Sequence, residues 1–111
     1  MFAFEIPGMR FSLPAGGAVK RHRFVSVNSN SAGITATAAT QIVGASMNKA
    51  ESGKVLEIAD GLVIVEASAA ITAGAAVYSA ADGRVASSGT VVAGVAITGA
   101  KAAGELVTVK I

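Results

Sequence analysis

The chain has 111 residues and no Cys, so it fits one small domain and cannot form disulfides or thiolate metal sites. Hydrophobic residues make up 52% of the sequence but aromatic residues only 5%, with no Trp, so any core is built mostly from Ala and Val. Nine Lys and Arg against seven Asp and Glu leave a net charge of +2, which is too weak to indicate a nucleic-acid partner.

The first residues predict an extended N-terminal arm over 1–12. Three of the four Phe residues lie in this segment, and Pro7-Gly8 interrupts regular structure there. Terminal segments are usually polar and frayed, so this apolar arm is expected to be buried, either over an open end of its own domain or in a neighbouring subunit or partner protein. The arm supplies five candidate contact residues: Phe2, Phe4, Ile6, Met9 and Phe11.

Residues 13–111 are predicted to form a single β domain, and its one cluster of charges is Lys20-Arg21-His22-Arg23. This cluster is interpreted either as a solvated strand end or as a basic patch that faces an acidic protein partner. The arginines that flank His22, the sole histidine, disfavour a protonated imidazole and make it a poor general base. Lys20, Arg21, His22 and Arg23 are therefore contact candidates and not catalytic ones.

The middle of the chain is dominated by short apolar runs and turn residues. Asn28 to Gly33 form a polar, turn-forming loop. The Ala-rich segments 35–39 and 66–70 compete as helices because Ala has the highest helix propensity. Both are short and contain Ser or Thr, so we expect at most one helical turn in either.

Two Asp-Gly pairs and an alternating C-terminus predict strands. Asp60-Gly61 interrupts an apolar run over 54–66, and Asp-Gly supplies the positive φ that a two-residue type I′ hairpin requires. Asp82-Gly83 repeats this pattern within 76–86. Residues 105–111 alternate, which predicts a half-buried closing strand with one apolar face made of Val107, Val109 and Ile111.

The two halves of the chain resemble each other. Three segments recur in the same order: 13–19 with 71–77, 42–47 with 92–97, and 50–56 with 100–106. The repeat predicts two similar strand units, about 13–66 and 69–111, neither of which closes a core alone. The expected fold is therefore all-β, a small compact antiparallel β-barrel or sandwich built from these units with an extended N-terminal arm.

The sequence contains no recognisable catalytic or metal centre. One His, no Cys and scattered carboxylates offer no ligand set at a known spacing. The predicted hairpin would place Glu57 opposite Glu66, but facing carboxylates on a sheet are more often a solvated pair. The Gly-rich segments 15–17 and 73–75 lack the Lys-Ser/Thr continuation of a phosphate loop. We therefore expect no enzyme activity and no cofactor.

Membrane insertion is not expected either. The uncharged stretches 67–81 and 85–100 contain Gly, Ser and Thr and are shorter than the ~20 apolar residues that a membrane helix needs. The N-terminus lacks the basic start and apolar run of a signal peptide. A core of small side chains buries little apolar area, so association with copies of the chain or with a larger surface is expected to add stability.

Two segments, Gly94 to Val109 and Ala69 to Tyr78, resemble the small capsid cement, or head decoration, proteins of tailed bacteriophages. The resemblance covers about residues 13–111. It implies a β-rich protein, often trimeric, that binds the outside of the head between major capsid protein subunits and reinforces the shell. Such a protein is made in the host cytoplasm and has no catalytic residues. The arm and the basic cluster are not part of this pattern, so their capsid contact is a separate hypothesis.

Two other functions compete with capsid reinforcement. A virion-surface module could recognise a receptor or carbohydrate, but sugar sites usually stack on aromatic rings, and the chain has no Trp and a single Tyr, Tyr78. A small barrel hydrolase would have to rely on His22 or the pair Glu57 and Glu66. The sequence favours reinforcement over both.

Overall fold

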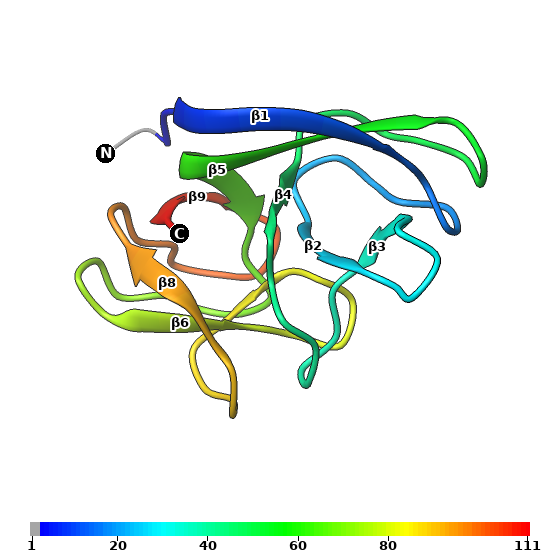
Figure 1. The fold of residues 1–111 in the computed structure, drawn as a ribbon. Helices are drawn as coiled ribbons and strands as arrows, with labels where there is room; N and C mark the ends of the chain where they lie inside the picture. The colour runs from blue at the N-terminus through cyan, green and yellow to red at the C-terminus, as the bar shows by residue number, and fades with distance from the viewer. Residues whose placement is uncertain (1–2) are drawn as a thin grey trace.

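The computed structural model describes residues 3–111, which form nine strands and no helix. The strands are β1 (Ile6–Pro14), β2 (Phe24–Val27), β3 (Gly33–Thr35), β4 (Gly44–Ser46), β5 (Val55–Glu66), β6 (Ala76–Ser79), β7 (Val85–Ala86), β8 (Val92–Ala96) and β9 (Leu106–Lys110). Their ladders are all antiparallel and join in the order β3-β2-β4-β5-β9-β8-β6-β7, with β1 added to β5. The sheet curls strongly into a half-barrel (Figure 1). The prediction of an all-β antiparallel fold is confirmed.

Strand β5 is the centre of the sheet. It is twelve residues long, and β1 pairs along one of its edges from Val55 to Leu62. On the other edge it pairs first with β4, at Ile58 and Ala59, and then with β9, from Leu62 to Glu66. Figure 1 shows β1 lying along β5. One long strand therefore holds both halves of the sheet together.

The predicted Asp60-Gly61 hairpin is wrong, because β5 runs straight through it. Gly61 has the expected positive φ, +90°, but uses it within the strand, where the partner β1 has a register shift between Pro7 and Arg10. The Asp60 carboxylate accepts the Met9 N–H at 2.7 Å and fixes this irregularity. A positive-φ glycine serves a bulge as well as a turn. Pairing of β5 with strands distant in sequence, rather than the local Asp-Gly signal, decided that this segment is not a turn.

The predicted hairpin at Asp82-Gly83 is confirmed, with a longer turn. Strands β6 and β7 pair on either side of it. The Gly83 N–H donates to the Ala80 carbonyl at 3.1 Å, and the Ala80 N–H donates to the Arg84 carbonyl at 2.8 Å. Gly83 has a φ of +80°, which explains why glycine stands there.

The C-terminal strand β9 is more buried than predicted. Val107 and Val109 face the core as expected, but Thr108 on the opposite face is also fully buried. The reason is the N-terminal segment, whose Phe4 main chain exchanges two hydrogen bonds with the Thr108 hydroxyl, each 2.6 Å long. The prediction of a half-buried strand fails at Thr108 because sequence alternation carries no information on a distant covering segment.

The two halves of the sheet share a hydrogen-bonding pattern. The bridge between Val19 and Ala50 corresponds to that between Ile71 and Ala100. Positive φ angles recur 52 residues apart, at His22 and Gly74 and at Ser31 and Gly83. These bonds align Val19 with Ile71, whereas the sequence match of 13–19 with 71–77 paired Val19 with Val77. The other two matches agree with the bonding.

The core is assembled from small side chains. Ten of its 22 buried hydrophobic residues are Ala, and Phe24 is the one buried aromatic among them. They form two clusters, a larger one spanning both halves and a smaller one around Leu56 and Ile58 under β1. At roughly 25 cal/mol per Å² of apolar area, Ala contributes little per residue. The fold therefore depends heavily on its backbone ladders.

Candidate functional site

The structure places the N-terminal candidates in different environments. Phe2 lies outside the described residues. Phe4, Ile6 and Met9 are exposed, Ile6 and Met9 to 62% each. Phe11 is half-buried and packs on the cluster around Leu56 and Ile58. From Ile6 onward the segment is strand β1, paired with β5 of its own chain. Three of the five candidates therefore present apolar side chains on the surface.

Polar contacts hold the start of the described chain against β5 and β9. In addition to the Phe4 bonds with Thr108, the Glu5 carboxylate accepts the Ile64 N–H at 3.3 Å, beyond the last residue of β5 that pairs with β1. The Glu66 N–H is in turn satisfied by the His22 carbonyl at 3.0 Å. The N-terminal segment and the basic cluster thus meet along one edge of β5.

The basic cluster is divided by the fold. Lys20 and Arg21 are exposed. His22 is half-buried and has a φ of +61°, a conformation that non-glycine residues adopt at a cost. Arg23 is only 9% exposed, and its Nη1 atom lies 3.3 Å from Glu66 Oε1. The four residues therefore do not form one uniform basic patch.

The surroundings of His22 disfavour its protonated form. Its Nδ1 atom is buried and has no hydrogen-bond partner among the described residues. Burial lowers the pKa of His22, and the charge of Arg21 lowers it further, whereas the Ile64 backbone and Glu5 have smaller opposite effects. A neutral imidazole between the N-terminal segment and β5 makes this contact sensitive to acid.

This sensitivity predicts a pH effect on stability. The pKa of His22 is lower in the folded protein than in the unfolded chain, where it is about 6.5. The stabilisation that neutral His22 contributes to the fold is therefore complete above pH 6.5 and is lost as the pH falls below this value. We expect the melting temperature to drop between neutral pH and about pH 5. His22→Asn, which tolerates positive φ and does not titrate, should reduce that drop. Thermal melts of both proteins over this range check the prediction; equal drops would contradict it.

An ion-pair network lies beside the basic cluster. Arg23 contacts Glu66, Glu66 contacts Arg84 at 3.4 Å, and Arg84 Nε lies 2.8 Å from the Asp82 carboxylate. Desolvation raises the pKa of Asp82, but hydrogen bonds and the charge of Arg84 outweigh it and hold the pKa below its usual value. The network joins β5 to the β6–β7 hairpin and alternates in sign, so its own net charge is zero.

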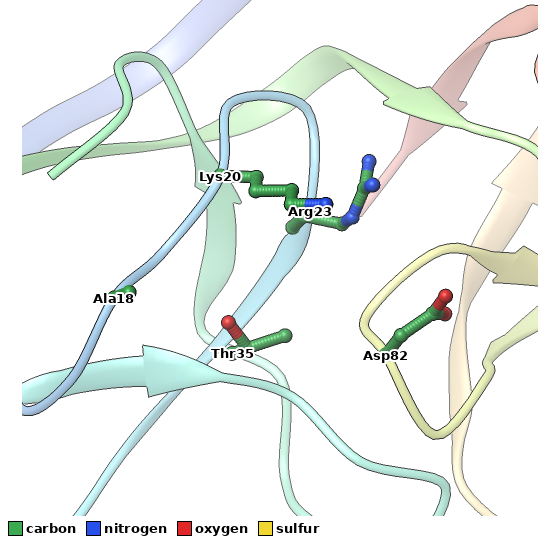
Figure 2. Close-up of a pocket in the computed structure, with 5 residues that line it drawn as sticks. All are labelled: Ala18, Lys20, Arg23, Thr35 and Asp82. Atoms are coloured by element: carbon green, nitrogen blue, oxygen red, sulfur yellow. The ribbon is translucent and has the colours of Figure 1, made fainter.

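A pocket of about 210 Å³ opens between this network and the basic cluster. Its walls are Ala18, Lys20, Arg23, Thr35 and Asp82. Figure 2 shows Lys20 and Arg23 on one side, Asp82 across from them and the Thr35 side chain between. The two halves of the sheet both contribute, since Asp82 lies in the β6–β7 turn of the second half.

A second surface feature is apolar and covers the outer side of β1, β5, β9 and β8. Facing residues on adjacent strands share a face, and one register row on this side runs Ile6, Leu62, Lys110, Val95. The core-facing neighbours Val63 and Val109 point the other way. A row rich in apolar side chains therefore faces solvent.

A parallel row extends this surface. Ile64 faces Thr108, and the Ile97 N–H donates to the Thr108 carbonyl at 2.8 Å. Phe4 lies over this row through its bonds to Thr108. We define the outer apolar face as the apolar residues of these two rows, without Lys110 and Thr108, together with the N-terminal residue above them: Phe4, Ile6, Leu62, Ile64, Val95 and Ile97.

The other end of β5 has a different outer surface. There Ser12 of β1 faces Glu57 of β5, and Arg10 forms an ion pair with Glu57 at 3.0 Å. Glu57 and Glu66 lie nine positions apart on one strand, about 30 Å at 3.3 Å per residue, so the predicted opposition of these carboxylates is wrong. Val55 is also exposed at this end of β5, but it stands beside this charged pair and not within an apolar row.

Sequence reasoning found Phe4 and Ile6 but missed the other members of this face. Leu62 and Ile64 belong to the continuous run Leu62-Val63-Ile64-Val65, which follows Asp60-Gly61 and therefore resembles one arm of a hairpin. A strand without alternation indicates burial on both faces. That signal predicts that the outer side of β5 is apolar, as the structure shows for Leu62 and Ile64.

Metal ligation and membrane insertion find no support in residues 3–111. Between residues 3 and 111, no three His, Cys, Asp or Glu side chains converge where they could hold a metal ion. Nor does any helix in this part of the chain have the length and apolarity to cross a membrane. The pocket and the outer apolar face remain as the features to be explained.

The comparisons with known proteins agree with each other. Residues 6–111 match the family described as phage cement protein. No curated protein sequence matches the chain. Among solved structures, the chain is similar to the N base of the head fiber gp8.5 of bacteriophage phi29, with 20% identity and a TM-score of 0.75, over 93% of this chain and 92% of that one.

At this level of identity the structural likeness shows a shared fold. The family match shows more than the fold, because it extends from the first residue of β1 to the last residue of the chain. It also agrees with the resemblance found in the sequence. The chain belongs to the phage cement protein family and is a structural protein rather than an enzyme.

Proposed function

We propose that this protein binds the outer surface of an assembled phage head and stabilises the capsid against disruption. Family membership implies binding to capsid proteins. The proposal adds the partner and the place: the major capsid protein, at sites between its subunits on the outside of the shell. The outer apolar face carries the proposal, because a cement protein needs a surface that gains free energy when it is covered.

The exposure of this face supports docking. Ile6 is 62% exposed, Val95 42% and Ile97 36%, although none of them is needed to close the core. Contiguous apolar surface on a soluble protein marks an interaction site more often than single exposed residues do. Covering it contributes roughly 25 cal/mol per Å², a modest amount for one copy. On a shell with many equivalent sites, such contacts reinforce the whole particle.

Self-association is the second element of the proposal. We propose a homo-oligomer, most simply a trimer, as in the family that the sequence resembles. The Ala-rich core supports this, since small side chains leave the single chain with little stabilisation from burial. Sedimentation of the purified protein over a range of concentrations tests it. A single species with the mass of one chain throughout would contradict it.

Head reinforcement has a direct test. Undecorated heads of the parent phage are mixed with saturating protein, separated from the free chain and heated. We expect the protein to sediment with the heads, to leave unassembled capsid protein unbound, and to raise the temperature at which the heads release their DNA. Unchanged release with protein bound would contradict stabilisation, and absence of binding would contradict the function as a whole.

A further inference from the structure

The pocket between the two halves of the sheet has the donors of a carboxylate site. Arg23 lines the pocket and is anchored, since Nη1 contacts Glu66 Oε1 and donates to the His22 carbonyl at 3.4 Å. Both contacts use Nη1, which leaves Nε and Nη2 for another partner. Because only 9% of Arg23 is exposed, its guanidinium is nearly fixed and would lose little freedom on binding.

Two further groups can donate from the other walls. Lys20 is exposed and forms no ion pair within residues 3–111. The Thr35 hydroxyl forms no hydrogen bond within the same residues, and in Figure 2 it points to the side where Lys20 and Arg23 lie. An ammonium, a guanidinium and a hydroxyl therefore line one half of the pocket. This combination suits a carboxylate oxygen pair.

The electrostatic balance also favours an anion. The network of Arg23, Glu66, Arg84 and Asp82 contains two cations and two anions and cancels. Lys20, which lines the pocket, lies outside this network, so the local excess is positive. A like charge would be repelled here, and a carboxylate would be attracted. The attraction is screened by salt, since the mouth is open to solvent.

We propose that this pocket takes the carboxylate of an acidic side chain from an extended segment of the protein's partner. The carboxylate would lie between Lys20, Thr35 and Arg23, and a main-chain N–H of the segment would donate to Asp82 on the opposite wall. The volume of about 210 Å³ suits one side chain rather than a whole small-molecule ligand. Identification of that partner as the capsid protein rests on the proposed function.

A nucleic-acid strand suits the pocket less well. Its phosphates would approach the Asp82 carboxylate, whereas a peptide brings a donor to that position. Base stacking would require an exposed aromatic side chain, and Phe24, next to Arg23, is fully buried. The geometry therefore favours an acidic peptide over a phosphate backbone.

The test uses the isolated protein, so it is independent of any capsid. Nitrogen-15-labelled protein is titrated with a blocked peptide that carries one Glu between Ala and Gly residues, and with the same peptide carrying Gln. We expect the Glu peptide to shift the amide signals of Lys20, Arg23, Thr35 and Asp82, and to bind about tenfold more tightly than the Gln peptide. Added salt should weaken binding of the Glu peptide and leave binding of the Gln peptide unchanged.

Matched variants make the test specific. Lys20→Gln should weaken binding of the Glu peptide about tenfold, whereas Lys101→Gln, at an exposed lysine that does not line the pocket, should leave binding unchanged. Thr35→Val, which keeps the shape of the side chain, should weaken binding of the Glu peptide without altering the melting temperature of the protein. Equal binding of the Glu and Gln peptides, or no effect of Lys20→Gln, would overturn the proposal.

Two outcomes separate this inference from other possibilities. Shifts of the same amides that are larger with a short oligothymidylate than with the Glu peptide would overturn the peptide proposal in favour of nucleic acid. If the protein binds heads but does not bind the Glu peptide, the carboxylate site in the pocket is rejected and the proposed function stands. If the protein binds the peptide but not heads, the carboxylate site stands and the proposed function is rejected.

Discussion

The double substitution Ile6→Asp and Val95→Asp is expected to abolish binding to phage heads while leaving the fold intact. Both side chains lie on one row of the outer apolar face, on β1 and β8. Both are exposed in the free protein, so each substitution should change its stability by at most about 0.5 kcal/mol. In a docked state, each carboxylate would be buried without a partner, at a cost of about 1–3 kcal/mol.

The two substitutions together should therefore weaken head binding by at least about thirtyfold. Co-sedimentation of labelled protein with undecorated heads measures this. A matched control is the pair Val27→Asp and Val55→Asp, which changes exposed strand valines outside the outer apolar face. It should bind like the unaltered protein. If both pairs bind equally well, the capsid contacts a different surface.

The second large effect is expected on stability, at Gly61. Alanine at this position must adopt a φ of +90°, and its Cβ would collide with the backbone of Gly8 in the neighbouring strand β1. A left-handed conformation alone costs roughly 1–2 kcal/mol. The collision adds to it, because β1 must shift away from β5. We expect Gly61→Ala to lower the free energy of unfolding by at least about 3 kcal/mol.

Gly53 provides the control for this prediction. It also has a positive φ, +81°, but a Cβ there would meet no atom within 4 Å. Gly53→Ala should therefore cost only the conformational part, about 1–2 kcal/mol. Urea unfolding of the two variants compares them directly. Equal losses would mean that Gly61 behaves as a free turn residue and that β1 does not press against it.

Local sequence signals carried much of the fold. The Asp82-Gly83 hairpin and the apolar side of β9 follow from turn chemistry and alternation over a few residues. The family resemblance also lay in local patterns, since it was read from Gly94 to Val109 and Ala69 to Tyr78. These features depend on residues close in sequence, so the sequence alone predicts them.

The candidate site was predicted only in part, for the opposite reason. Sequence singled out Phe4, Ile6 and Met9, and the structure exposes them. It also grouped Arg23 with Lys20 as one basic patch, whereas the fold buries Arg23 against Glu66, which is 43 positions away. Asp82, on the facing wall of the pocket, was assigned only to a turn. Partners so distant in the chain leave no local signal.

The sequence alone determined that this is a small all-β protein without a catalytic centre and that it resembles phage cement proteins. Composition, turn residues and strand alternation suffice for that, because each acts over a short stretch of chain. Only the tertiary structure decided that Asp60-Gly61 lies within β5, opposite the register shift of β1, and does not form a hairpin, and that Phe4 covers Thr108. Both depend on strands that meet across long sequence separations, where the free energy of pairing outweighs local preference.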